Sequence, residues 1–145
     1  MSAQETDSAA RRREQLRAVA EAYFEALRRQ DFASIPYDDN VTLRAPLTPV
    51  GVNEPLVGTE ALRTQWWEPM APALEGVQIR VLDHYVNEAL TSIIAEAEIT
   101  MTRVMPPATL RVADRFTVNA AGRIVEQENH FDPRDVVTNP GWQSR

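Results

Sequence analysis

The sequence predicts an α+β domain in which a bent antiparallel sheet wraps around a long N-terminal helix. Helical spacing of apolar residues is found in the first half of the chain, and two-residue alternation is found in the second half. Helices followed by a run of strands are typical of α+β domains. A length of 145 residues suits one domain with its own core.

The first predicted element is an amphipathic helix from about Ser8 to Arg29. Its apolar residues share one stripe at three- and four-residue spacing, namely Leu16, Val19, Ala20, Tyr23, Phe24 and Leu27. Residues 31–40 are interpreted as a connection that contains a turn, and residues 41–43 as a short strand. Three prolines and two glycines then mark residues 46–58 as a long loop of the kind that often covers a pocket.

A second, short helix is predicted from Glu60 to about Trp67, with Thr59 as its cap and Pro69 and Pro72 ending it. The strand predicted at residues 77–86 loses its alternation at Leu82, which indicates a bulge or a face of mixed burial.

The strand at residues 92–104 alternates cleanly and carries Glu96 and Glu98 on its polar face. Alternation assigns these two carboxylates to solvent or to a dimer partner rather than to catalysis.

Asp114 interrupts the next alternating strand, residues 110–118, on the face that otherwise carries Val112, Phe116 and Val118. A carboxylic acid aimed into an apolar interior resists ionisation, so it can act as an acid or as a hydrogen-bond donor. The structural alternative for Asp114 is a salt bridge with an arginine.

A short link containing Gly122 predicts that this strand forms a hairpin with residues 124–131. The two-residue period places on one face of the second strand Val125, Gln127, Asn129 and Phe131. If this is the face of Asp114, polar groups converge in an apolar setting, which is typical of a small-molecule pocket. For Gln127 and Asn129 the alternative is a satisfied hydrogen-bond network within the sheet.

Composition excludes several kinds of chemistry. The chain has no cysteine and no lysine, which removes thiol nucleophiles, thiolate metal sites and Schiff-base catalysis. The two histidines, His84 and His130, stand in no recognised ligand spacing, so we expect no metal and no other cofactor. A net charge of −6 opposes non-specific binding to nucleic acid or to an anionic membrane. With no apolar run of about 20 residues, the sequence predicts a cytoplasmic protein.

The order of these elements resembles the nuclear transport factor 2-like superfamily, which includes ketosteroid isomerases, limonene epoxide hydrolases and SnoaL-like polyketide cyclases. The resemblance spans about Leu16 to Asp135 and is carried by residues 22–27 (AYFEAL), 38–46 (DDNVTLRAP), 113–116 (ADRF) and 122–126 (GRIVE). It implies a cone-shaped barrel over residues 11–137, with a disordered tail at residues 1–10 and a C-terminal tail at residues 138–145.

The resemblance also implies roles for single residues. Tyr23 falls where the isomerases place the tyrosine of their oxyanion hole, and Asp114 falls where they place the protonated aspartic acid. The simpler interpretation of Tyr23 is a core tyrosine. The isomerase base is replaced by Ala45, and Asn129 stands where epoxide hydrolases and SnoaL-like cyclases have a catalytic aspartate. Neither specific activity transfers intact.

Two residues are candidates for the missing base. His84 has an unperturbed pKa near neutrality, but alternation favours a solvent or interface position for it. Asp83 continues the inward set of its strand, and only one of the two can face inward.

We therefore expect a cofactor-independent enzyme that acts on a hydrophobic, oxygenated small molecule by isomerisation, cyclisation, dehydration or epoxide opening. The predicted catalytic residues are Tyr23, Asp83, His84 and Asp114, and the predicted substrate-binding residues are Trp66, Phe116, Gln127, Asn129 and Phe131. The alternative is a non-catalytic binding or dimerisation module. This superfamily commonly pairs through its sheets, so we expect a homodimer with no nucleic-acid or membrane partner.

Overall fold

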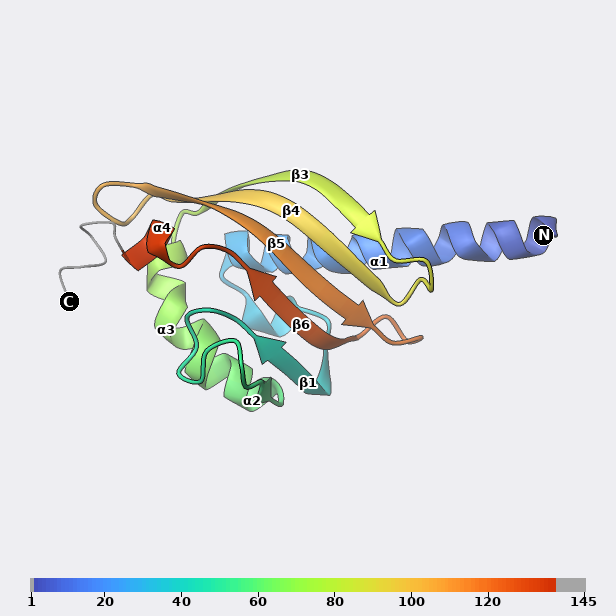
Figure 1. Ribbon diagram of the computed structural model, residues 1–145, viewed down its shortest axis with the longest axis horizontal. Helices are drawn as coiled ribbons and strands as arrows, with labels where there is room; N and C mark the ends of the chain where they lie inside the picture. The colour runs from blue at the N-terminus through green and yellow to red at the C-terminus, as the bar shows by residue number, and fades with distance from the viewer. Residues whose placement is uncertain (1, 138–145) are drawn as a thin grey trace.

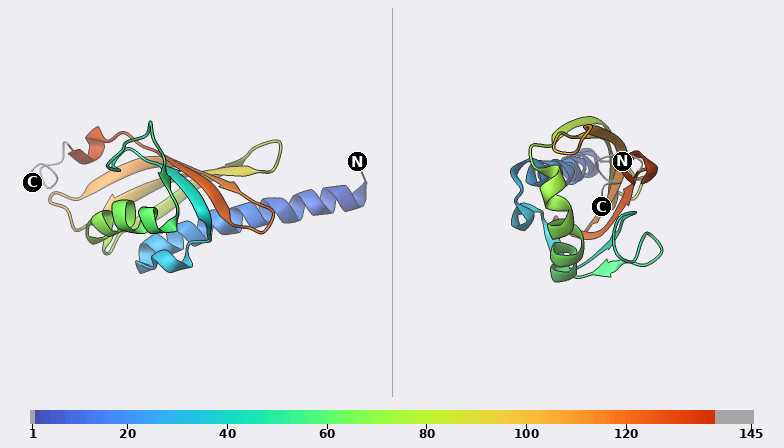
Figure 2. Two further views of the ribbon diagram at one scale, coloured as in Figure 1. Left: turned by 90° about the horizontal axis from the view of Figure 1, so that it is seen from below. Right: turned by 90° about the vertical axis from the view of Figure 1, so that its left-hand side faces the viewer.

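A computed structural model describes residues 2–137 and confirms the predicted α+β architecture. One six-stranded sheet in the order β2-β1-β6-β5-β4-β3 curves around helix α1 without closing, so that β2 and β3 form its edges. Figure 1 shows α1 lying along the sheet, and Figure 2 shows the sheet curling around it. The predicted tail at residues 138–145 lies outside the described residues.

Helix α1 (Ala3–Arg29) buries the predicted stripe against the inner face of the sheet. It begins five residues before the predicted start at Ser8, inside the segment expected to be a disordered tail. A capping box explains the earlier start, because Ser2 and Glu5 satisfy each other's backbone N–H groups. The N-terminal turns of α1 extend beyond the sheet (Figure 1).

Arg12 fastens α1 to the two turns at this end of the sheet. Its guanidinium donates hydrogen bonds to the carbonyl oxygens of Leu90, Val118 and Asn119 at 2.7–3.1 Å. Gln15, one turn further along α1, accepts a hydrogen bond from Arg12 at 2.6 Å. A cation that is fixed by several carbonyl oxygens holds the helix and both turns in one arrangement.

Strand β1 (Tyr37–Arg44) starts four residues earlier than predicted, because it pairs in parallel with β6 (Ile124–His130) from Tyr37 onward. After a short 3-10 turn, η1 (Phe32–Ser34), the chain therefore enters the sheet directly. The predicted loop at residues 46–58 is shorter at its end, where β2 (Leu56–Val57) pairs antiparallel with β1.

The second helical segment continues past its predicted end at Trp67. It runs through α2 (Thr59–Leu62), a π-helical turn η2 (Arg63–Trp67), α3 (Glu68–Met70) and a 3-10 turn η3 (Ala71–Leu74). Pro69 and Pro72 do not end it, because each stands in the first turn of a new short helix, where the missing N–H costs nothing.

The predicted antiparallel meander is confirmed. It consists of β3 (Gln78–Val86), β4 (Ser92–Met101), β5 (Ala108–Val118) and β6, followed by the short helix α4 (Arg134–Val137). The outer face of the sheet is charged, and ion pairs join Glu98 to Arg80 and Arg111, and Arg115 to Glu126 and Glu128. Within residues 2–137, no helix combines the length and the apolar character that crossing a bilayer requires.

Candidate active site

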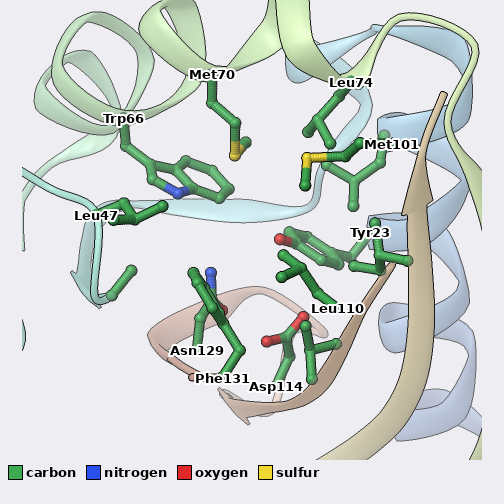
Figure 3. Close-up of a pocket in the computed structure, with 14 residues that line it drawn as sticks. Tyr23, Leu47, Trp66, Met70, Leu74, Met101, Leu110, Asp114, Asn129 and Phe131 are labelled. Carbon is green, nitrogen blue, oxygen red and sulfur yellow. The ribbon is translucent and has the colours of Figure 1, made fainter. Parts of the chain in front are cut away.

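A cavity of about 70 Å³ lies between the C-terminal half of α1, the helical segment from α2 to η3, and the ends of β4, β5 and β6. Its wall is mainly apolar, and Figure 3 shows three polar side chains, Tyr23, Asp114 and Asn129, converging on it. The other lining residues are Leu27, Ala45, Leu47, Trp66, Met70, Leu74, Ile99, Met101, Leu110, Val112 and Phe131.

Asp114 lies in the middle of β5, directly opposite Ala95 of β4 and Asn129 of β6. Its side chain is 2% exposed, and its Oδ1 atom is buried without a hydrogen-bond partner among the described residues. Burial raises the pKa of Asp114 to about 8, with no contribution from a neighbouring charge. Asp114 is therefore mainly protonated at neutral pH, and among residues 2–137 it forms no salt bridge with an arginine, so that alternative is wrong.

Tyr23 reaches the cavity from α1. Its ring lies 5.0 Å from the ring of Phe116 and stacks on Trp66 at 6.4 Å, measured between centroids. Burial is the main reason that the pKa of Tyr23 lies well above its usual value, and the proximity of Asp114 and Tyr37 adds to this effect. Hydrogen bonding with Gln127 and Asn129 acts in the opposite direction. The hydroxyl keeps its proton and can serve as a hydrogen-bond donor.

Asn129 and Gln127 belong to a buried chain of hydrogen bonds behind the cavity. The hydroxyl of Tyr37 donates to Oε1 of Gln127 at 2.7 Å, and Nε2 of Gln127 donates to Oδ1 of Asn129 at 3.0 Å. Gln127 is fully buried and does not line the cavity, whereas Asn129 does. Both the predicted pocket position and the predicted network within the sheet therefore apply to Asn129.

The apolar wall contains two of the residues predicted to bind substrate, Trp66 and Phe131. The π-helical turn places Trp66 and Trp67 next to each other in the buried layer, where Trp66 faces the cavity and Trp67 packs on Phe32. Phe116, also predicted to bind substrate, is fully buried behind Tyr23 and does not line the cavity.

The two candidate bases lie outside the cavity. A shift of register between Val81 and Asp83 reverses the alternation of β3. Asp83 is therefore exposed on the outer face, where it stands opposite Glu96 in the register of β3 and β4. His84 instead faces inward, opposite Ala95 and beside α1. Its Nε2 atom is buried without a partner among the described residues, and burial and then Arg17 lower its pKa. The predicted assignment of faces to Asp83 and His84 was wrong, because it carried the two-residue period through the bulge.

A second register shift corrects the predicted face of β6. It lies between Thr117 and Val118 of β5, and it places Ile124 in the core while Val125 is only partly buried. Gln127 and Asn129 keep their predicted inward orientation because they lie beyond the shift.

Tyr37 is the functional candidate that the sequence pattern missed. The polar residues 38–40 that follow it indicate a turn, and the parallel partner that holds Tyr37 in the sheet is about 90 residues away in the chain. Local alternation does not reveal it, because Asp39 is exposed and the register of β1 shifts between Tyr37 and Thr42.

The chemistry available to this site follows from its donors. Among the described residues that line the cavity, only Asp114 and Tyr23 titrate, and both hold their protons at neutral pH. No three His, Asp or Glu side chains within residues 2–137 come close enough together to hold a metal ion. The arrangement can polarise or protonate a substrate oxygen in an apolar setting.

Comparison with known proteins places this geometry among related folds. The family of SnoaL-like domains matches residues 20–127 of the chain. No curated protein sequence matches it. SalBIII, an epoxide hydrolase/cyclase-like enzyme described in pyran ring formation in polyether salinomycin, is 17% identical with a TM-score of 0.70. That match covers 85% of this chain and 95% of SalBIII.

Two further solved structures are similar. A protein of Xanthomonas campestris pv. campestris that is assigned as a polyketide cyclase is 17% identical with a TM-score of 0.68, over 88% of this chain and 98% of its own. RV0760c of Mycobacterium tuberculosis, in complex with estradiol-17beta-hemisuccinate, is 12% identical with a TM-score of 0.66, over 81% of this chain and 94% of its own. At these identities the likeness shows a shared fold alone.

Proposed function

Because the chain belongs to the family of SnoaL-like domains, we propose that it is a cofactor-independent enzyme that transforms a hydrophobic, oxygenated small molecule by acid catalysis. The observation that supports this most directly is the carboxyl group of Asp114, which is neutral, buried and unpartnered at Oδ1 in the wall of an apolar cavity. An unsatisfied buried polar atom costs free energy in the folded state, so its retention indicates a use for it.

In the proposed reaction Asp114 donates its proton to a substrate oxygen as the carbon–oxygen bond to that atom breaks. Tyr23 donates a hydrogen bond to the same oxygen. The carboxylate that is left on Asp114 takes up the proton released by the attacking hydroxyl group of the substrate, which restores the neutral acid. A preorganised donor of this kind lowers the barrier by about 3 kcal/mol.

The nucleophile is a hydroxyl group of the substrate in this proposal, because no described side chain at the cavity wall can remove a proton at neutral pH before Asp114 has given up its own. Asn129 is an amide, and the carboxylate of Asp83 lies outside the cavity. Ring closure by opening an epoxide, or by loss of water, therefore fits the residues better than an isomerisation that needs a strong base. The fold shared with SalBIII, an epoxide hydrolase/cyclase-like enzyme, is consistent with this choice.

A panel of hydrophobic hydroxy-epoxides tests the proposal, with cyclic ether formation followed by chromatography and NMR. We expect Asp114→Asn to lower the rate by about 100-fold or more, since proton transfer by a positioned acid contributes that much. Asp39→Asn, the same change at an exposed carboxylate of β1, is the matched control and should retain the full rate. Turnover retained in both Asp114→Asn and Tyr23→Phe would contradict the proposal.

The second candidate function is ligand binding without conversion. The absence of a base at the cavity wall, where Ala45 and Asn129 stand, favours it. Extraction of purified protein distinguishes the two functions. An unmodified ligand that the protein holds and does not convert over hours would indicate a binding module, whereas conversion would exclude one.

We also propose that two copies pair through the outer face of the sheet. Glu98 lies there between Arg80 and Arg111, and mixed charges of this kind can meet their complements on a second copy related by twofold symmetry.

A further inference from the structure

The hydrogen-bond chain behind the cavity has a direction. It starts at the hydroxyl of Tyr37, passes through the amide of Gln127, and ends at the amide of Asn129, which lines the cavity. All three side chains are buried. The chain joins β1 to β6 and runs from Tyr37, at the start of β1, toward Asn129 near the end of β6.

Each amide has one accepting oxygen and one donating nitrogen. The hydroxyl of Tyr37 occupies Oε1 of Gln127, so the nitrogen of Gln127 faces Asn129. That nitrogen occupies Oδ1 of Asn129, which leaves Nδ2 of Asn129 for the cavity. In Figure 3 this nitrogen points into the cavity, on the side of the hydroxyl of Tyr23.

The same network assigns the proton of Tyr23. Hydrogen bonding with Gln127 and Asn129 lowers the pKa of Tyr23, which is the effect of N–H groups directed at the tyrosine oxygen. An oxygen that accepts from its amide neighbours directs its O–H toward the cavity or Asp114. The polar wall thus offers N–H and O–H donors from three different elements, α1, β5 and β6.

We propose that Tyr37 is a positioning residue that holds Asn129 with its N–H toward the cavity, so that the site selects a substrate oxygen that only accepts hydrogen bonds. The substrate class is a ketone, enone, epoxide or cyclic ether oxygen, rather than a group that must donate. This inference rests on the proposed function and adds the polarity of the recognised group. Asn129 contacts the substrate, whereas Tyr37 acts through Gln127.

The reverse direction is the alternative that the test must exclude. If Tyr37 accepted from Nε2 of Gln127, Oε1 of Gln127 would accept from Asn129, and Oδ1 of Asn129 would face the cavity. The site would then favour a ligand that donates a hydrogen bond.

Binding of two small ring compounds tests the direction of the hydrogen bonds between Tyr37, Gln127 and Asn129 without any turnover. Cyclopentanone only accepts hydrogen bonds, and pyrrole only donates, whereas their rings have the same number of atoms. Dissociation constants are measured by NMR titration that follows the side-chain amide of Asn129. We expect the protein to bind cyclopentanone about tenfold more tightly than pyrrole, with a shift of the Nδ2 protons that saturates along with binding.

Tyr37→Phe removes the hydroxyl group and keeps the ring. Because the two amides are then free to rotate, we expect the tenfold preference to fall to about twofold or less. Tyr85→Phe, the same change at an exposed tyrosine that bonds Glu96 on the outer face, is the matched control and should keep the full preference. If Tyr37→Phe does not fold, Asn129→Leu provides the same comparison, and it should weaken cyclopentanone binding about fivefold and leave pyrrole binding unchanged.

Tighter binding of pyrrole, or an unchanged preference in Tyr37→Phe, would overturn the inference and leave the proposed acid catalysis by Asp114 intact. An ionised Asp114 at pH 7, measured by carbon-detected NMR, would instead overturn the proposed function. Failure of both ring compounds to bind would likewise overturn the inference alone.

Discussion

Asp114 illustrates how position alone sets the chemistry of a residue. Its neighbours across the sheet are an alanine and an asparagine, and no arginine within residues 2–137 forms an ion pair with its carboxyl group. Removal from water is therefore the only large influence on its ionisation. Glu98 and Glu128, by contrast, lie on the outer face beside arginines, which lower the pKa of each.

This difference predicts an unusual dependence of stability on pH. The pKa of Asp114 is about 8 in the folded protein, against 3.8 for an ordinary aspartic acid. At a pH between these two values the folded state therefore keeps a proton that the unfolded state has released. Stability from this group is therefore greatest below pH 4 and falls as pH rises to 8, by up to about 1.4 kcal/mol per pH unit. Denaturant unfolding of the protein and of Asp114→Asn from pH 5 to 9 measures the effect.

We expect the difference in unfolding free energy between Asp114→Asn and the unchanged protein to grow in favour of the variant with increasing pH, and to level off above pH 8. Asp39→Asn should show no such trend. Parallel pH profiles for the protein and Asp114→Asn would show that Asp114 ionises normally.

At the scale of elements, Arg12 attaches the arginine-rich start of α1 to the sheet. The run of residues 11–13 resembles a solvated helix end in the sequence, yet Arg12 turns toward the sheet and bonds three carbonyl oxygens. Gly122 in the β5–β6 turn has φ of 81°, and a Cβ atom there would lie 2.8 Å from Nε2 of Gln15. The turn and the helix are therefore fitted to each other closely.

Arg12→Gln should lower the free energy of unfolding by about 2 kcal/mol, because it leaves three partly buried carbonyl oxygens without their charged donor. Arg13→Gln, one residue further on an exposed side of α1, provides the control and should change stability by less than about 0.5 kcal/mol. Denaturant unfolding measures the free energy of unfolding of both variants. Equal losses in Arg12→Gln and Arg13→Gln would show that Arg12 does not stabilise the fold through these hydrogen bonds.

The elements also show what the sequence could and could not predict. Strand β5 and residues 127–130 of β6 alternate without interruption, so the sequence alone predicted an inward Asp114 and one shared face for Gln127 and Asn129. That these two faces are the same follows from the pairing of Asp114 with Asn129 in the structure. The bulge in β3 was visible as a broken pattern, but its effect on Asp83 and His84 was not, because a register shift is defined only by the partner strand. Tyr37 depended on parallel pairing with β6, a contact that local periodicity does not contain.

At the scale of the whole molecule, the sheet separates two different surfaces. Its inner face packs on α1 and ends in the cavity, whereas its outer face carries alternating arginines and glutamates. A sheet that leaves one face free of helices has that face available for a second copy.

We expect sedimentation at micromolar concentration and low salt to show a dimer, and 0.5 M salt to shift it toward monomer because salt screens exposed charges, with a Debye length of a few Å near 1 M. Arg111→Glu should weaken the dimer, since it opposes the charge pattern around Glu98. Arg123→Glu, the same reversal in the exposed β5–β6 turn, should not. A monomer under low-salt conditions would refute pairing through the sheet.

The position of Trp66 provides the protein with an intrinsic fluorescent reporter. Its indole ring stands in the cavity wall and stacks on Tyr23, whereas Trp67 packs on Phe32 away from the cavity. In a variant that carries Trp67→Phe and Trp142→Phe, emission comes from Trp66 alone. A ligand that enters the cavity displaces water from this indole, so its emission should shift to shorter wavelength and saturate with occupancy. The emission of Trp66 can thus be used to screen colourless compounds for binding before any reaction is known.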